Sequence, residues 1–272
     1  MMPTPELRFL MIVEHPGIAA FVAAHGVDRL FVDLEVMGKA DRQGHLDTVQ
    51  SVLRSADITP LREAAPDANL LVRINPLHQG SGNEIDEVLA RGADAVMLPM
   101  FHDTDTLSRF FDLLGGRAEA VPLFETVGAV DALPEMIGKV PLTDLHIGLN
   151  DLHLERGDPM MFTPLAEGVL EEAAAALRGA GIPFGLGGVA RAGEGAVPPE
   201  LVLGEHVRLG STAAILSRTF HRRAPDPETL QRTMDFPAEI AKLRRIYHDF
   251  VGHPGQLEEN RKLFRARVAA LG

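Results

Sequence analysis

Short apolar runs alternate with longer amphipathic stretches along most of the chain. Such runs are typical of buried strands, and the amphipathic stretches between them are typical of helices. The alternation therefore predicts parallel strands joined by crossover helices. We expect eight strands, at Arg8–Val13, Arg29–Leu34, Leu70–Ile74, Ala95–Leu98, Ala120–Phe124, Asp144–Gly148, Pro183–Leu186 and His206–Leu209.

Helices are expected between these strands, most of them closed by a glycine, as is common at helix ends. We place them at Ile18–His25, His45–Ser55, Asn83–Arg91, Asp105–Leu114, Val127–Ile137 and Pro164–Gly181. Eight strand–helix units predict an α/β fold, a (β/α)8 TIM barrel over residues 1–223. The competing open sheet would place a glycine-rich turn after the first strand, where this chain has Glu14, His15, Pro16 and Gly17.

The pattern changes after Arg223 to charged amphipathic sequence, which predicts a C-terminal helical extension over residues 224–272. Its last helix carries an apolar stripe of Leu257, Phe264, Val268 and Leu271. Such a stripe packs either on the barrel of its own chain or on a neighbouring subunit. The stripe exceeds what closing a barrel requires, so we expect a homo-oligomer.

Charge and composition exclude several classes of function. The chain has 272 residues, with 26 Lys and Arg against 38 Asp and Glu, and a net charge of -12 disfavours nucleic acid as a partner. The absence of cysteine excludes disulfides, thiolate nucleophiles and cysteine-ligated metals. We find neither a signal-peptide pattern nor the ~20 apolar residues that cross a bilayer, and we expect a cytoplasmic protein with no membrane partner.

Polar residues gather at the predicted carboxyl ends of the strands, where barrels of this type carry their reactive groups. Several carboxylates and one arginine would converge there, and like charges raise each other's pKa unless a cation neutralises them. A divalent metal with oxygen ligands, Mg²⁺ or Mn²⁺, is the simplest solution. The positions are Glu14, His15, Asp33, Glu35, Arg73, Asn75, Glu125, Asn150, Asp151, Gly187 and Gly188.

Five segments in order resemble the HpcH/HpaI aldolase and citrate lyase β-subunit family. They are FVDLE (31–35), LVRINP (71–76), GADAVMLPM (92–100), LFET (123–126) and IGLNDL (147–152). The resemblance implies a metal-dependent barrel that makes or breaks a carbon–carbon bond next to a 2-oxo acid or an acyl-CoA. It also implies a trimer or hexamer, since members of the family commonly form these assemblies.

The resemblance also implies roles for individual residues. It places the metal on Glu125 and Asp151, and it makes Arg73 the group that stabilises an enolate. Asp33 and Glu35 would hold metal-bound water or Arg73, and a plain salt bridge between Arg73 and either carboxylate is compatible with that role. Backbone N–H groups and side chains at the strand ends are candidates for binding substrate, although the glycine pair could equally form a simple tight turn. These candidates are Asn75, Gly148, Asn150, Gly187 and Gly188.

The sequence departs from both well-known branches of the family. Val36 stands where the aldolase branch has a histidine that acts as general base, and Leu123 stands where a glutamine is common. The citrate lyase branch typically has an acid at the first of these positions and a lysine at Met100. A CoA thioester substrate is therefore less expected, and the substrate does not follow from the family.

Another group must then accept the proton of the aldol hydroxyl, and we favour His15, whose strand neighbours the one ending in Glu35. The alternatives are Glu14, His78, His153 and a water molecule steered by Asp33 or Glu35, whereas His146 lies within a strand and is expected to be structural. A Schiff-base mechanism is not expected, because no lysine ends a predicted strand. The four lysines are Lys39, Lys139, Lys242 and Lys262.

Three functions follow from this sequence. The leading hypothesis is a metal-dependent carbon–carbon lyase, an aldolase that acts through the enolate of a pyruvate-like 2-oxo acid with an aldehyde as second substrate. The second is a citryl-CoA or malyl-CoA type of lyase. The third is a non-catalytic barrel that binds a metal and a 2-oxo acid, and the loss of the histidine at Val36 motivates it.

Overall fold

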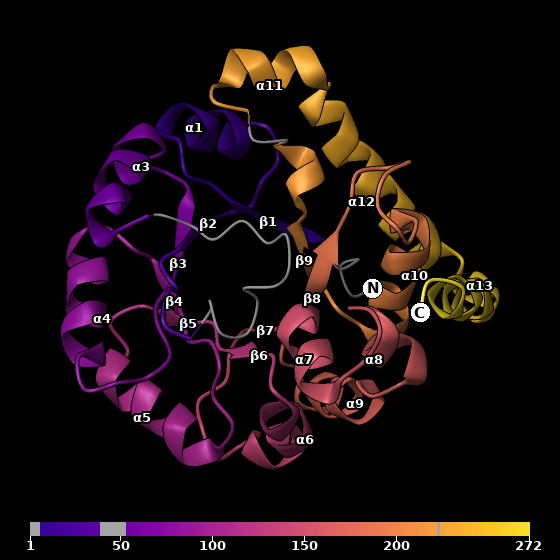
Figure 1. Ribbon diagram of the computed structural model, residues 1–272, viewed down its shortest axis with the longest axis horizontal. Helices are drawn as coiled ribbons and strands as arrows, with labels where there is room; N and C mark the ends of the chain where they lie inside the picture. Colours follow the sequence, from indigo (N-terminus) through magenta and orange to yellow (C-terminus); the bar gives the residue numbers. More distant parts are fainter. Residues whose placement is uncertain (1–5, 39–52, 222–223) are drawn as a thin grey trace.

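The computed structural model describes residues 6–38, 53–221 and 224–272, and it shows a ring of strands enclosed by helices (Figure 1). All strand pairs are parallel. The strands are β1 (Arg8–Ile12), β2 (Arg29–Asp33), β3 (Asn69–Arg73), β4 (Ala95–Met97), β5 (Glu119–Ala120), β6 (Leu123–Phe124), β7 (Leu145–Ile147), β8 (Phe184–Val189) and β9 (Ala213–Leu216).

The sheet closes on itself through β5 and β6, which stand at its two ends in the order β5-β4-β3-β2-β1-β9-β8-β7-β6. These two strands are consecutive parts of one extended segment, interrupted at Pro122, which has no N–H to donate. The Leu123 N–H still bonds the Leu98 carbonyl on the β4 side, at 2.9 Å, while Leu123 pairs with His146 on the other side. The predicted (β/α)8 barrel is therefore confirmed.

Helices surround the barrel and continue beyond it. They are α1 (Pro16–Ala24), α3 (Ile58–Ala64), α4 (Ser81–Ala90), α5 (Thr104–Leu114), α6 (Val127–Met136), α7 (Leu149–Arg156), α8 (Thr163–Glu167), α9 (Glu171–Ala180), α10 (Pro199–Leu209), α11 (Pro227–Thr233), α12 (Phe236–Gly252) and α13 (Leu257–Ala269). Short 3-10 turns lie at Ser55–Asp57, Arg218–Phe220 and Pro254–Gln256.

Two apolar clusters follow from the alternation of side chains along each strand. The smaller cluster fills the barrel interior and includes Leu10, Phe31, Leu71 and Met97. The larger one lies between the strands and the surrounding helices. The barrel interior is thus filled by a packed apolar core.

Two predictions of elements are wrong. His206–Leu209 is not a strand but the end of α10, and the eighth strand follows it as β9. Gly210, with φ 82°, ends that helix in the left-handed conformation that glycine tolerates. The predicted helix Pro164–Gly181 is two helices, α8 and α9, because Gly168 at φ 85° ends the first. The predicted helix His45–Ser55 lies mostly outside the described residues.

The C-terminal extension packs on its own barrel. Helix α13 lies against α10 and α8, and Phe264 and Val268 of the apolar stripe are buried there. Leu271, in contrast, is exposed. The stripe is therefore largely covered within one chain and no longer argues for a neighbouring subunit. No helix in the described ranges combines the length and apolar composition that crossing a membrane requires.

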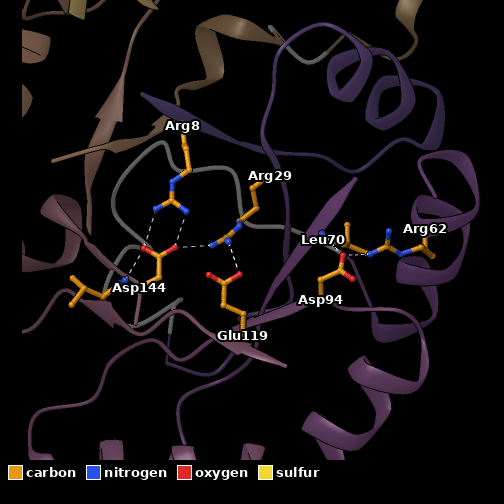
Figure 2. A network of polar contacts seen from close by, with 8 residues as sticks. Arg8, Arg29, Arg62, Leu70, Asp94, Glu119 and Asp144 are labelled. Atoms are coloured by element: carbon orange, nitrogen blue, oxygen red, sulfur yellow. Dashed lines mark hydrogen bonds and ion pairs between the residues drawn. The ribbon is translucent and has the colours of Figure 1, made fainter. Parts of the chain in front are cut away.

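An ion-pair network closes the amino end of the barrel (Figure 2). Asp144, just before β7, accepts hydrogen bonds from both terminal nitrogens of Arg8, at 3.1 and 3.2 Å. Arg29 Nη1 lies 3.3 Å from the same carboxylate. Arg29 Nη2 also reaches Glu119 at 2.6 Å. Nearby, the Asp94 carboxylate pairs with Arg62 and accepts the Leu70 N–H at 2.8 Å. These side chains join strands that are distant in sequence.

Candidate active site

An arginine whose side chain is only 12% exposed stands at the carboxyl end of β3 and is held by the strand beside it. Arg73 donates to Asp33 through two nitrogens, with Nε–Oδ1 at 2.9 Å and Nη2–Oδ2 at 2.8 Å. Its Nη2 also lies 3.4 Å from Glu35 Oε2. Burial by itself lowers the pKa of Arg73, but the neighbouring carboxylates, Asp33 first, raise it above its usual value. The guanidinium is therefore a permanent cation in a fixed orientation.

Glu125 follows β6 directly and is buried beside this arginine. Its Oε1 accepts the Met100 N–H at 3.2 Å. Burial raises the pKa of Glu125 to about 8; Arg73 opposes this shift, and the charges of Asp151 and Glu35 add to it. The carboxyl group is thus costly to ionise until a cation compensates its charge.

Met100 is a residue that the sequence analysis did not place in the site. It has φ 52°, a left-handed backbone conformation that costs a residue with a side chain of order 1 kcal/mol or more. Its N–H points at Glu125 in this conformation. Met100 closes the Leu-Pro-Met segment of the strand motif, and that segment was the available sequence signal.

Helix α7 brings Asp151 to the same end of the barrel. Gly148 precedes this helix as its N-cap, and Asp151 is buried in the first turn. A Cβ on Gly148 would lie 2.8 Å from the Cβ of Glu125, closer than such atoms approach. The glycine therefore allows the helix to start directly against the glutamate. Asn150, between the two, is partly buried.

The donor set fits a hard divalent ion. Asp151 is near enough to Glu125 for its charge to raise the pKa of that carboxyl group, and oxygen ligands suit Mg²⁺ and Mn²⁺. In the part of the chain that the structure describes, no three acidic, histidine or cysteine side chains converge tightly enough to hold an ion by themselves. Mg²⁺ commonly binds through one or two carboxylates with water and substrate oxygens, so two protein ligands agree with this set.

His15 lines a cavity of about 440 Å³ that Asp33 also lines. It caps α1 by accepting the Gly17 N–H on Nδ1, at 3.1 Å. A neutral ring that accepts on Nδ1 carries its hydrogen on Nε2. His15 would thus accept a proton only through Nδ1, after it releases Gly17. Glu14 is exposed and lines the same cavity.

The other histidines considered as bases are engaged elsewhere. His153 is buried on α7 with Nδ1 3.3 Å from the Leu149 carbonyl, and His78 Nε2 lies 3.2 Å from Glu84. His146 is buried inside β7, with Nε2 2.9 Å from the Gly187 carbonyl. Burial lowers the pKa of His146 to about 4, so the ring is neutral and donates through Nε2.

The glycines of β8 sit on this ring and on α7. A Cβ on Gly185 would overlap the imidazole of His146, and a Cβ on Gly187 would lie 2.7 Å from Leu149 Cδ1. The register of β8 against β9 shifts between Gly185 and Gly188. The glycine stretch is thus more than a tight turn, because close packing and an irregular strand both require it.

Asn75 lies two residues after Arg73, and its side chain binds the backbone of the loop after β2. Its Oδ1 accepts the N–H groups of Val36 and Met37 at 2.9 and 3.0 Å, and its Nδ2 donates to Glu84 at 2.8 Å. Its role as a substrate-binding residue stays a prediction.

The structure thus belongs to the class of (β/α)8 barrels that carry buried carboxylates and a fixed arginine at the carboxyl ends of their strands. No family model matches the sequence, and no curated protein sequence matches it. Solved structures do resemble it in fold, at low sequence identity. An HpcH/HpaI aldolase from Desulfitobacterium hafniense has a TM-score of 0.59 and 17% identity, covering 78% of this chain and 86% of that one.

Two further neighbours carry the same family name or that of its citrate lyase branch. A HpcH/HpaI aldolase/citrate lyase family protein from Burkholderia cenocepacia has a TM-score of 0.62 and 16% identity, over 84% of this chain and 95% of that one. The citrate lyase β subunit from M. tuberculosis, complexed with oxaloacetate and magnesium, has a TM-score of 0.61 and 17% identity, over 90% and 97%. The structural neighbours are therefore proteins of the family that the five sequence segments indicated.

Proposed function

We propose that this chain is a metal-dependent carbon–carbon lyase that acts through the enolate of a pyruvate-like 2-oxo acid. The observation that carries the proposal is the buried Glu125, whose pKa is raised to about 8 among Asp151, Glu35 and the fixed Arg73. A buried carboxylate of this kind is stabilised by a divalent cation. The structural neighbours support a lyase, and one of them was solved with magnesium and a 2-oxo acid.

Each group then has a chemical role. Glu125 and Asp151 would hold Mg²⁺ or Mn²⁺, which when bound would polarise the oxygens of the 2-oxo acid. Arg73, oriented by Asp33, would stabilise the negative charge that develops on the enolate oxygen. The N–H groups at the start of α7, after Gly148, would bind the substrate carboxylate.

The proton of the aldol hydroxyl needs an acceptor in this scheme. Two candidates remain: His15 after release of its cap, and a water molecule held by Asp33 or Glu35. General-base catalysis of this type contributes roughly 10²–10⁴-fold in rate. The leaving product would be an aldehyde, and the 440 Å³ cavity beside His15 and Asp33 offers space for it.

Metal binding and enolate formation test the proposal separately. Glu125→Gln and Asp151→Asn should each weaken Mn²⁺ binding, measured by electron paramagnetic resonance, by at least about tenfold. Glu135→Gln, at an exposed position of the following helix α6, is the matched control and should bind Mn²⁺ as the wild type does. Unchanged affinity in both site variants would refute the metal assignment.

Deuterium exchange at the methyl group of pyruvate, followed by NMR, reports enolate formation directly. The wild type with Mg²⁺ should catalyse this exchange, and the Arg73→Met variant should lose most of it. Tight metal and pyruvate binding without exchange would instead support a non-catalytic binding barrel. Val36 supports that alternative. It is an apolar side chain, 59% exposed, at the position where the aldolase branch has its histidine.

A further inference from the structure

The loop that leaves β2 is fastened to the next strand by one side chain. Asn75 Oδ1 accepts two consecutive N–H groups, from Val36 at 2.9 Å and Met37 at 3.0 Å. Two adjacent amides can share one oxygen only when the backbone turns sharply at that point. The turn comes directly after Glu35, which is buried, whereas Val36 and Met37 are exposed.

Helix α4 fixes the orientation of the Asn75 amide. Glu84 Oε1 accepts both the backbone N–H of Asn75, at 3.0 Å, and its Nδ2, at 2.8 Å. Because the nitrogen of the amide faces a carboxylate, its oxygen must face Val36 and Met37. Glu84 is itself held through Oε2 by His78, at 3.2 Å. Glu84 of α4 and Asn75 together therefore form a clamp on the loop after β2.

Glu35 is consequently restrained from two directions. On one side Arg73 Nη2 lies 3.4 Å from its carboxylate, and its own N–H donates to Asp33 Oδ1 at 3.2 Å. On the other side the clamp holds the two residues that follow it in the chain. Arg73 ends β3 and Asn75 follows two residues later, so this short stretch of chain holds both the side chain of Glu35 and the backbone after it.

We propose that Asn75, oriented by Glu84, is a positioning residue that keeps the Glu35 carboxylate against Arg73, and not a residue that binds substrate. Its catalytic consequence rests on the proposed lyase function, whereas its structural consequence does not. Misplacing a charged group by about 1 Å can cost on the order of 10²-fold in rate, so a clamp outside the site can control turnover.

The structural arm of the test uses hydrogen exchange of the peptide that covers residues 34–38, measured by mass spectrometry. Asn75→Ala and Glu84→Ala should each speed exchange of this peptide about tenfold or more, because the two N–H groups lose their acceptor or its orientation. Glu84→Gln keeps an acceptor oxygen for Asn75 and should restore slow exchange. Asn83→Ala, in the same helix, should leave exchange unchanged. Unchanged exchange in Asn75→Ala would overturn the proposal.

The kinetic arm separates positioning from binding. Asn75→Ala should lower kcat for pyruvate methyl exchange about 10- to 100-fold and leave KM within about threefold. In a Glu35→Gln background the same substitution should have little further effect, because it acts through Glu35. A raised KM with unchanged kcat, or full additivity with Glu35→Gln, would overturn the proposal. Absence of exchange in the wild type would refute the lyase function instead, and the hydrogen-exchange arm would still decide the clamp.

Discussion

Replacing Arg29 should destabilise the fold while sparing the site at the other end of the barrel. Arg29 joins Asp144 and Glu119 across the amino end, at 3.3 and 2.6 Å. The side chains of Arg29 and Asp144 are only 10% and 6% exposed, so water cannot take over the lost interactions. Arg29→Met keeps much of the side-chain length and removes the charge.

The size of the effect follows from what the substitution leaves behind. Removing one partner of a buried ion pair typically costs about 3–5 kcal/mol, because the other charge stays buried. Here Asp144 keeps Arg8 and the Leu145 N–H, and Glu119 is one-third exposed, which together reduce the loss. We therefore expect Arg29→Met to lower the free energy of unfolding by about 3 kcal/mol.

Urea unfolding at pH 7 measures this loss. With a slope of about 3 kcal/mol per molar urea, the midpoint should fall by about 1 M. Arg91→Met, which removes a half-exposed pair with Glu87 on the surface of α4, is the control and should leave the midpoint unchanged. Mn²⁺ affinity of the folded variant should equal that of the wild type. A midpoint for Arg29→Met as high as that of the control would refute the reasoning.

Three further predictions concern pH, packing and assembly. Burial lowers the pKa of His146 to about 4 and of His206 to about 3, below the unfolded value near 6.5, so each takes up a proton on unfolding in acid. The contribution of each histidine to stability should be complete above pH 6.5 and fall by up to about 1.4 kcal/mol per pH unit down to pH 4, and His206→Gln should remove its own share of that slope in urea titrations at several pH values. Gly148→Ala should displace Glu125 and weaken Mn²⁺ binding at least about tenfold, as a titration monitored by paramagnetic resonance would show. The family resemblance still predicts a homo-oligomer, so light scattering should give a mass above 29.4 kDa, and a monomer at micromolar concentration would contradict it.

The alternation of apolar runs and amphipathic stretches predicted the barrel well, because seven of the eight expected strands are short apolar segments that the structure also forms as strands. It failed at His206–Leu209, where polar and apolar residues alternate at the end of a helix and so match the local pattern of a strand. The true strand, β9, is Ala-Ala-Ile-Leu, and its alanines carry little strand preference. Tertiary packing, rather than local sequence, decides between the two segments.

The candidate site was predictable where residue types carry the chemistry, and the Arg73–Asp33 pair lies where the sequence placed both residues. What escaped prediction depends on backbone geometry. The left-handed conformation of Met100 and the double acceptance by Asn75 arise from chain directions that no motif encodes. The amino-end network was missed for a related reason, since its members come from strands that become neighbours only when the barrel closes.

The contact between Gly185 and the ring of His146 makes two positions in different strands depend on each other. Any side chain at position 185 would occupy the space of the imidazole, so neither residue can change freely while the other stays. Among homologues, a larger residue at 185 should therefore occur only together with a smaller one at 146, and the two positions should covary. A designer who wants a side chain at position 185 would have to reduce residue 146 in the same step, since the first change alone overpacks the site and the second alone leaves a cavity.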